Sequence, residues 1–428
     1  MSRAIFAATL VMSLIGADAG AQTAVKLTLK QAERQAEDNH PLIRAGHYAE
    51  LAAAETIREA RSAYFPAAIG SFTGAGAMDG TRIAAGGLNN PTILDRFAAG
   101  LSFSQLLTDF GRTNDLVRSS ELSAESRQRD TDARKSDVLL QVDRAYFNAL
   151  RAHAVLKVAQ QTVDARTLVV DQVTALADSN LKSGLDVSFA KVNLGEAQLF
   201  LVQAKNDLQS AYASLAAALG STQVNEYELE DEPLPAAPPE DCAALIDAAL
   251  RQRPDVAAQR VAAQAAAAFA HAEGNLWMPS VSFVGAAGVT PYHQVGLNDR
   301  YSAAGINITV PLSNGNLFAA RGAEARFRAQ SQDESVRDAE NRLRRDVTVA
   351  WLDARTAYQR LDLTNQLFAQ ASDALDLADS RYNLGLGSIV ELTQAQLNKT
   401  RAEIEQATAR YEYQARTTAL QYQTGDLK

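Results

Sequence analysis

The chain has 428 residues, of which 24 are glycine and 11 are proline, about 8% of the total against roughly 12% in average proteins. Its net charge of −9 leaves no general basic surface, which argues against binding to nucleic acid. A single cysteine, Cys242, is too few for an internal disulfide or a thiolate zinc site. Neither Gly nor Pro occurs at 112–183 or 323–384, which indicates very long helices and argues against a compact α/β enzyme.

Residues 1–21 have the pattern of a secretory signal peptide. Arg3 supplies a positive start, Ala4 to Gly16 form an apolar core, and the small residues at 17–21 offer a cleavage site. A buried N-terminal helix is the alternative interpretation. After this segment no window holds 18 uninterrupted apolar residues, so no transmembrane helix is expected. Export agrees with the near absence of cysteine.

The rest of the chain is predicted to contain one unit twice. Pro66 and Pro279 stand 213 residues apart in matching surroundings, and Gly220 and Gly425 stand 205 apart. The difference places eight extra residues in the first copy between Pro66 and Ala98, and an insertion confined to one place is typical of a loop. The sequence therefore divides into a first repeat, an acidic and proline-rich linker, and a second repeat, at 22–220, 221–240 and 241–428.

Both repeats are predicted to have the same order of elements. A short helix (about 29–39 and 241–252) is ended by a proline, and a second helix then runs to Pro66 or Pro279, the expected joints between helix and barrel. The apolar period next changes from about 3.6 to 2, which predicts strand pairs within about 67–107 and 280–311. The individual strands are expected at 67–78, 97–107, 281–289 and 301–310, with turns around 80–91 and 291–298. Long helical hairpins follow at about 112–219 and 317–424.

The long helices carry a heptad pattern that is duplicated in register. From Val138 to Ala177, eleven of twelve positions spaced alternately four and three apart are apolar, and Arg166 is the exception. The same positions 205 residues later depart from this pattern only at Thr364. This period predicts coiled-coil packing, and the many alanines allow close contact among several helices. At about 1.5 Å per residue, such a helix spans on the order of 100 Å.

Strands of this length cross a bilayer when they are tilted, but four strands cannot close a barrel by themselves. Because an open sheet edge cannot face lipid, closure requires other copies of the chain. Two copies would give 8 strands and three would give 12, with the long helices continuing along the same axis. The pattern therefore predicts a hollow conduit anchored in an outer membrane, with hairpin tips in the periplasm, and it leaves the number of copies open.

Several segments resemble the TolC-like outer membrane efflux protein family. They are Tyr64-Phe65-Pro66, Asp109-Phe110-Gly111, and above all Arg381-Tyr382-Asn383-Leu384-Gly385 followed by Ser388-Ile389-Val390-Glu391-Leu392. The resemblance implies a mostly α fold with a small β part, and a homotrimer whose 12-stranded barrel continues into a periplasmic helical barrel. It also implies a passive outer-membrane exit duct for tripartite efflux or type I secretion. A periplasmic adaptor and an inner-membrane pump of RND or ABC type would be its partners, and the exported substrate is not specified.

In that family the periplasmic tips of the hairpins form a gate. By position, Tyr382 is the gate tyrosine, Glu391 forms the first acidic ring, and Gln394 stands where a second acid is usual. Gly387 occupies the place of the basic gate partner, so the resemblance implies a looser or differently latched entrance. The residues predicted for the gate and its aperture are Tyr382, Glu391, Gln394, Asp186, Gly385 and Gly387.

Less specific interpretations of these residues stay open. Asp186 and Glu391 each follow a turn and begin a helix, where acids cap free N–H groups and favour the helix dipole. Tyr382 lies on the heptad seam and could serve packing alone. A periplasmic coiled-coil adaptor or scaffold without a pore is the alternative function. No catalytic set accompanies the kinase-like Asp109-Phe110-Gly111, the five histidines lack metal spacing, and no cofactor is expected.

Overall fold

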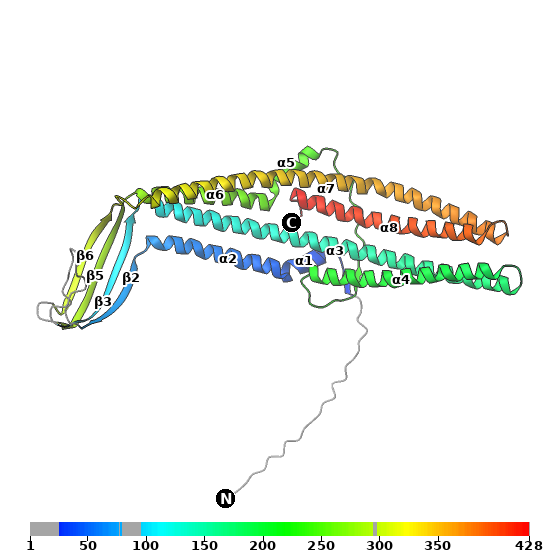
Figure 1. The fold of residues 1–428 in the computed structure, drawn as a ribbon, viewed down its shortest axis with the longest axis horizontal. Helices are drawn as coiled ribbons and strands as arrows, with labels where there is room; N and C mark the ends of the chain where they lie inside the picture. Colours follow the sequence, from blue (N-terminus) through cyan, green and yellow to red (C-terminus); the bar gives the residue numbers. More distant parts are fainter. Residues whose placement is uncertain (1–24, 77, 79–95, 294–297, 428) are drawn as a thin grey trace, which may run out of the picture.

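The computed structural model describes residues 25–76, 78, 96–293 and 298–427. The molecule is elongated, with a small β-sheet at one end and two helical hairpin tips at the other (Figure 1). The predicted signal peptide at 1–21, the turn at 80–91 and residues 294–297 of the turn at 291–298 lie outside the described residues. Residues 291–293, predicted to belong to that turn, are instead the end of a strand that begins at Ser280. Among the helices of the described part, none combines the length and apolar character needed to cross a membrane.

Two unbroken helices run the length of the helical part. These are α3 (Arg112–Asp178) and α7 (Leu317–Asn383), each of 67 residues, or about 100 Å. Each is accompanied by two shorter helices, one toward the sheet and one toward the tip (Figure 1). Along α3 these are α2 (Pro41–Arg61) and α4 (Gly184–Ala218), and along α7 they are α6 (Pro254–Gly274) and α8 (Ile389–Thr424).

The companion helices meet end to end at mid-length through glycines. Gly220, just after α4, has a φ of +70°, and a Cβ there would lie 2.9 Å from the Cα of His40 at the start of α2. Gly425, the C-cap of α8, has a φ of +82° and would place a Cβ 3.3 Å from the backbone nitrogen of Arg253, which precedes α6. Glycine is favoured at both positions because it adopts positive φ and allows this close approach.

The strands form one antiparallel sheet in the order β2-β3-β5-β6. Its strands are β2 (Ala67–Ala75), β3 (Arg96–Thr108), β5 (Ser280–His293) and β6 (Arg300–Thr309). The two predicted strand pairs are thus joined through β3 and β5, where Phe103 lies opposite Gly285. A Cβ at Gly285 would lie 2.2 Å from the Phe103 ring, so only glycine leaves room for that ring. The duplicated helix, strand, strand, helix order predicted from sequence is confirmed.

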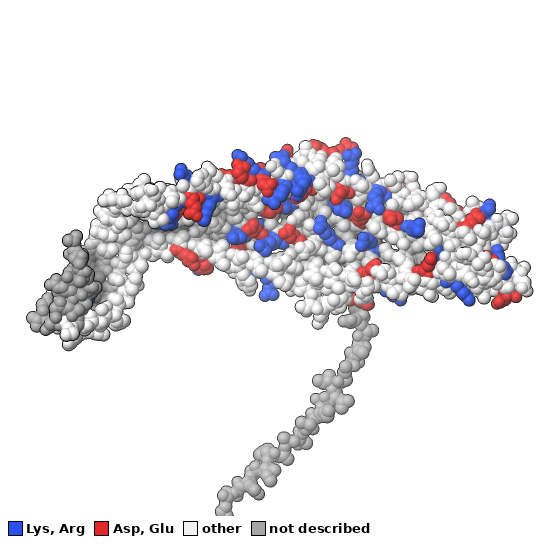
Figure 2. Space-filling view, viewed as in Figure 1, with Lys and Arg blue, Asp and Glu red and all other residues white. Residues whose placement is uncertain are grey.

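The sheet has one apolar face and one face of mostly small or polar side chains. Register and alternation place exposed Phe72, Leu101, Phe103, Ile306 and Ile308 on the first face, and Ser71, Ser102, Ser104, Ser282 and Asn307 on the second. Among the residues of these four strands, Arg96 and Arg300 are the only Lys, Arg, Asp or Glu, and both lie at the end away from the helices. Figure 2 shows charged side chains spread over the helical part, while the described sheet is white.

A second, two-stranded sheet was missed by the sequence interpretation. β1 (Val25–Leu27) pairs in parallel with β4 (Tyr227–Leu229), so part of the predicted linker at 221–240 is a strand. The fully buried Tyr146 of α3 fixes this pair, since its hydroxyl oxygen lies 2.9 Å from the Leu27 carbonyl, 2.8 Å from the Glu230 carbonyl and 3.1 Å from the Glu230 amide nitrogen. Three-residue strands with no alternation carry too little pattern to be predicted.

The joints to the sheet also differ from the expectation that helices run up to the prolines. α2 ends at Arg61 and α6 at Gly274, and short 3₁₀ turns (Ser62–Tyr64 and Asn275–Trp277) lead to Pro66 and Pro279. Each proline stands directly before a strand, β2 or β5. Proline suits this place because it cannot continue the helical hydrogen bonding and disfavours helical geometry in the residue before it.

The predicted heptad positions form the packed core of the helical part. Val142, Ala149 and Ala159 of α3 and Val347 and Ala354 of α7 are fully buried, as coiled-coil packing requires. Arg166, the polar exception, is also buried and donates a hydrogen bond to Gln396 of α8. Burial lowers the pKa of the Arg166 guanidinium, and the charge of Glu196 acts in the opposite direction.

Candidate functional site

Both hairpin tips are closed by the same backbone arrangement. After α7, Gly385 adopts a φ of +75°, its N–H donates to the Tyr382 carbonyl at 3.1 Å, and the Leu386 N–H donates to the Arg381 carbonyl at 2.8 Å. After α3, Asn180 takes the left-handed place, with matching bonds from the amides of residues 180 and 181. These are Schellman motifs, which require glycine or tolerate asparagine at the left-handed residue. The turns thus fix where each tip bends.

The two predicted acids occupy equivalent positions, three residues after the N-caps of α4 and α8. The Asp186 carboxylate accepts from the backbone N–H and the hydroxyl of Ser183 at 3.0 and 2.9 Å, completing a capping box. The Glu391 N–H donates to the Ser388 hydroxyl at 3.2 Å. Capping is therefore an observed role of both segments, and a role in lining an aperture stays a prediction.

Tyr382 lies in a small apolar cluster between the two hairpins. Its side chain, 5% exposed, packs with Val173 of α3 and with Ile389 and Leu392 of α8. Its hydroxyl is buried and has no hydrogen-bond partner among the described residues. Burial, and secondarily the negative charge of Asp186, raise the pKa of Tyr382, so the hydroxyl stays neutral. The packing role proposed for Tyr382 is therefore present in the structure.

Two cations that sequence reasoning missed lie beside these residues. The Lys182 ammonium, from the connection between α3 and α4, stands 4.0 Å from the centre of the Tyr382 ring. Arg381 forms an ion pair with Glu391 through its Nε at 3.1 Å, and it also donates to the Leu386 carbonyl at 3.3 Å. Arg381 directly precedes the gate tyrosine in the sequence. Its place in the last turn of a helix before the Gly385 turn could have indicated that it faces Glu391.

The remaining predicted residues lie at the same tip. Gly387 approaches closely enough that a Cβ would lie 3.2 Å from the Cβ of Arg381 and 3.3 Å from a carboxylate oxygen of Glu391. Gln394 is exposed on α8 and donates to the Asn398 side chain at 3.0 Å. Pro66 and Pro279 lie at the opposite end, beside the sheet, so the structure brings together the gate residues and separates the joints from them.

A carboxyl pair that was not predicted from the sequence lies at mid-length, with one buried and one half-buried member. Asp143 of α3 is 1% exposed, and burial, followed by the charge of Glu33 on α1 (Leu29–Asn39), raises its pKa to about 8. Burial also raises the pKa of Glu33, against the hydrogen bond to Asp143 and the charge of Lys30, which lower it. The pair therefore holds a proton near neutral pH that the unfolded chain would have lost.

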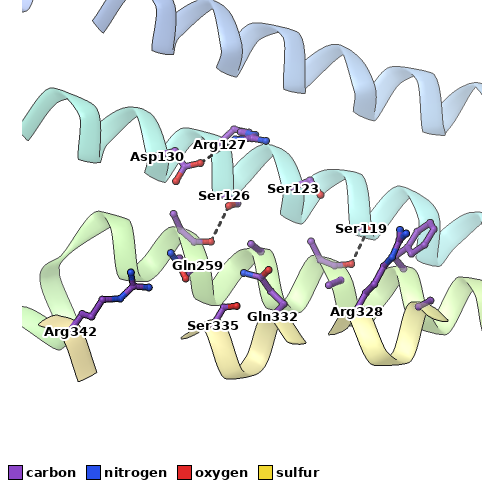
Figure 3. Close-up of a pocket in the computed structure, with 16 residues that line it drawn as sticks. Ser119, Ser123, Ser126, Arg127, Asp130, Gln259, Arg328, Gln332, Ser335 and Arg342 are labelled. Carbon is purple, nitrogen blue, oxygen red and sulfur yellow. Dashed lines mark hydrogen bonds and ion pairs between the residues drawn. The ribbon is translucent and has the colours of Figure 1, made fainter. Parts of the chain in front are cut away.

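A groove of about 680 Å³ lies between α3, α6 and α7 on the half nearer the sheet (Figure 3). The Ser119 and Ser126 hydroxyls each donate to an α6 carbonyl at 2.9 Å, and Arg328 and Arg342 line the α7 side. The serines are thus used in packing α3 closely on α6. The side chains lining this groove include no base beside a nucleophile and no set of metal ligands.

A two-faced sheet at one end and long helical hairpins at the other define the class of this protein, an outer-membrane exit duct for efflux or secretion. The chain belongs to the outer membrane efflux protein family, whose sequence model matches residues 33–221 and 245–426. The predicted family resemblance is confirmed.

Individual relatives agree with this assignment. The chain is 23% identical to the outer membrane protein TolC of Escherichia coli over 402 residues, covering 90% of this chain and 79% of TolC. Its fold is similar to that of a membrane protein from Pseudomonas aeruginosa (TM-score 0.81, 20% identity, 93% of both chains). It is also similar to the CmeC outer membrane channel of Campylobacter jejuni (TM-score 0.79, 16% identity, 93% of this chain and 85% of CmeC).

Proposed function

We propose that three copies of this chain form a passive duct through the outer membrane, with a 12-stranded barrel continued by a periplasmic helical barrel and gated at the hairpin tips. The observation that carries the proposal is the combination of a two-faced sheet with two unpaired edges. In the order β2-β3-β5-β6, β2 and β6 each have one edge that pairs with no other described strand. An open edge cannot face lipid, so β6 of one copy pairs with β2 of the next. A coiled-coil scaffold without a pore would leave this sheet unexplained.

The helical part supports closure by copies in the same way. At the tip half, α3 packs on both α4 and α8, which leaves α4 and α7 as the outer helices of the chain. Both carry exposed apolar side chains at heptad spacing, which we call the α4 seam and the α7 seam. They are Leu185, Phe189, Val192 and Leu199 in the first, and Leu363, Leu367 and Leu377 in the second. We infer that the α4 seam of one copy packs on the α7 seam of its neighbour.

The need for an open interior argues against a duct built from two copies. An eight-stranded barrel is filled by its own side chains, so two copies would not leave a conduit. With twelve strands the face bearing Ser71, Ser102 and Asn307 can line water, while the apolar face bearing Phe72 and Ile306 meets lipid. The family resemblance also implies three copies.

The tip residues supply the gate of this proposal. In a trimer, Glu391 and Asp186 recur around the axis, and Gln394 follows Glu391 one turn further along α8. The Gly385 turn and the close approach at Gly387 set the direction in which α8 leaves the tip. We infer that this end narrows the duct at rest. Glu391 would contribute a negative ring that Arg381 partly offsets within each chain.

Partners are proposed from the tip surface and the family. Leu181, Leu384, Leu386 and Val390 are between 59% and 73% exposed at the free tips. Such an apolar group suits a protein partner, and a periplasmic adaptor bridging to an inner-membrane pump of RND or ABC type would supply it. Because the duct is passive, we propose no catalysis and no cofactor, and the pump selects the exported substrate. The signal peptide at 1–21 stays a prediction.

The oligomer is tested by native mass spectrometry in detergent together with conductance in planar bilayers. We expect a three-copy mass and ohmic pores for the wild-type chain. Leu199→Glu, which places a charge in the α4 seam, should reduce the trimer, while the neighbouring exposed Gln198→Glu should not. A folded monomer whose strand amides are protected from exchange would refute the proposal, since the sheet would then need no second copy.

A further inference from the structure

Tyr382 lies at the contact between the two hairpin tips of one chain, which also includes a hydrogen bond from the Asn193 side chain of α4 to the Thr393 hydroxyl of α8 at 3.0 Å. Its ring lies among side chains of α3 and α8, so the residue belongs to one hairpin and packs on the other. Tyr382 could hold the tips by its hydroxyl or by its ring. The hydroxyl is buried and makes no hydrogen bond within the described residues, and the nearby Asp186 carboxylate accepts from Ser183 instead. The ring is thus the part of Tyr382 that is engaged across the tips.

The ring is covered by a cation from the first hairpin. The Lys182 ammonium lies 4.0 Å from the ring centre, well inside the range for a cation–π interaction. Because the tyrosine is 5% exposed, the ring face is largely removed from water, which strengthens this attraction. Lys182 lies in the turn before α4 and Tyr382 near the end of α7, so this contact joins the two hairpins.

We propose that Lys182 is a positioning residue that holds the two hairpin tips of one chain together through the ring of Tyr382, and that the tyrosine hydroxyl contributes nothing to this latch. Any effect of this latch on conduction depends on the proposed gate. Its effect on the structure of the tips does not.

Arg381 and Gly387 shape the tip of the second hairpin beside this contact. Arg381 pairs with Glu391 across the turn, and a side chain at 387 would crowd both the Arg381 Cβ and the Glu391 carboxylate. Gly387, which carries no side chain, therefore leaves the space in which Arg381 forms its ion pair with Glu391. The tip thus keeps basic groups at 182 and 381 while position 387 has none.

The test is hydrogen exchange of the assembled full-length protein in detergent, read on peptides covering 176–190 and 378–392. Lys182→Ala should speed exchange in both peptides by about fivefold, which corresponds to about 1 kcal/mol. Lys182→Arg should restore wild-type exchange because guanidinium also binds an aromatic face. Tyr382→Phe keeps the ring and removes an unpaired buried hydroxyl, so exchange should stay at the wild-type rate.

Two results would overturn the latch. One is wild-type exchange in Lys182→Ala, and the other is Tyr382→Phe loosening the tips as much as Lys182→Ala does. Conductance separates the latch from the gate. If Lys182→Ala loosens both peptides and raises the open-pore current, both proposals are supported. If it loosens both peptides and leaves the current unchanged, the latch stands and the gate at the tips is refuted.

Discussion

Removing one hydroxyl at mid-length should release the segment that joins the two repeats. In Tyr146→Phe the ring stays in its fully buried place, while the oxygen that lies within 3.1 Å of Leu27 and Glu230 backbone groups is lost. A hydroxyl has one proton, so it donates to one of the two carbonyls and accepts from the Glu230 N–H. The Glu230 N–H and the Leu27 carbonyl keep only their longer bond to each other at 3.3 Å, so the loss falls within the about 1–3 kcal/mol that an unpaired buried group costs. We take about 2 kcal/mol, because Leu27 is buried and Glu230 is exposed.

At 1.4 kcal/mol per factor of ten, that cost predicts roughly 30-fold faster exchange in peptides covering 25–30 and 226–231. Hydrogen exchange with mass spectrometry measures this directly. Tyr212→Phe is the matched control. The Tyr212 hydroxyl donates one hydrogen bond, to the Tyr227 carbonyl at 3.1 Å, so its loss should speed exchange of the second peptide by about fivefold. Equal exchange in wild type and Tyr146→Phe would refute the idea that this hydroxyl holds the β1 and β4 pair.

Three further outcomes are expected. Glu391→Gln should shift the reversal potential in a KCl gradient toward anion preference and Arg381→Gln toward cation preference, each by roughly two- to fivefold in permeability ratio. The pKa of Asp143 is raised to about 8, so its contribution to stability is greatest below about pH 4 and is lost as the pH rises through 8. The thermal midpoint of the wild-type chain should therefore fall between pH 5 and 8, and Asp143→Asn should make this fall smaller. Gly220→Ala should lower the thermal midpoint through at least about 1–2 kcal/mol of backbone strain, whereas Gly195→Ala, inside α4 with open space around its Cβ, should raise it slightly.

Periodicity was sufficient to predict the regular part of the fold. The predicted first helix, 29–39, matches α1, and the predicted end of the second hairpin at about 424 matches the end of α8. Capping serines or threonines and glycines mark such helix ends locally. The long helices were predictable because burial repeats every 3.5 residues over many turns. The joining of β3 to β5 was not, since pairing between strands about 180 residues apart leaves no local pattern in either strand.

The candidate site was also predicted only in part. Positions such as Tyr382 and Glu391 could be named from a motif, but their partners could not. Lys182 reaches Tyr382 across a distance of 200 residues in sequence, and nothing around it marks it as more than a loop lysine. Arg381 and Gly387 look unrelated in the sequence, and only the bent turn between them makes one depend on the other.

The breaks at Gly220 and Gly425 make bending stiffness uneven along the molecule. At that level α4 gives way to α2 and α8 to α6 without a continuous helix, so α3 and α7 alone carry unbroken backbone hydrogen bonding across it. The buried cluster around Tyr146, Leu215 and Leu219 gathers at the same section. A tilt of the tips would therefore be absorbed as flexure at mid-length, and the sheet could keep its strand pairing while the far end moves.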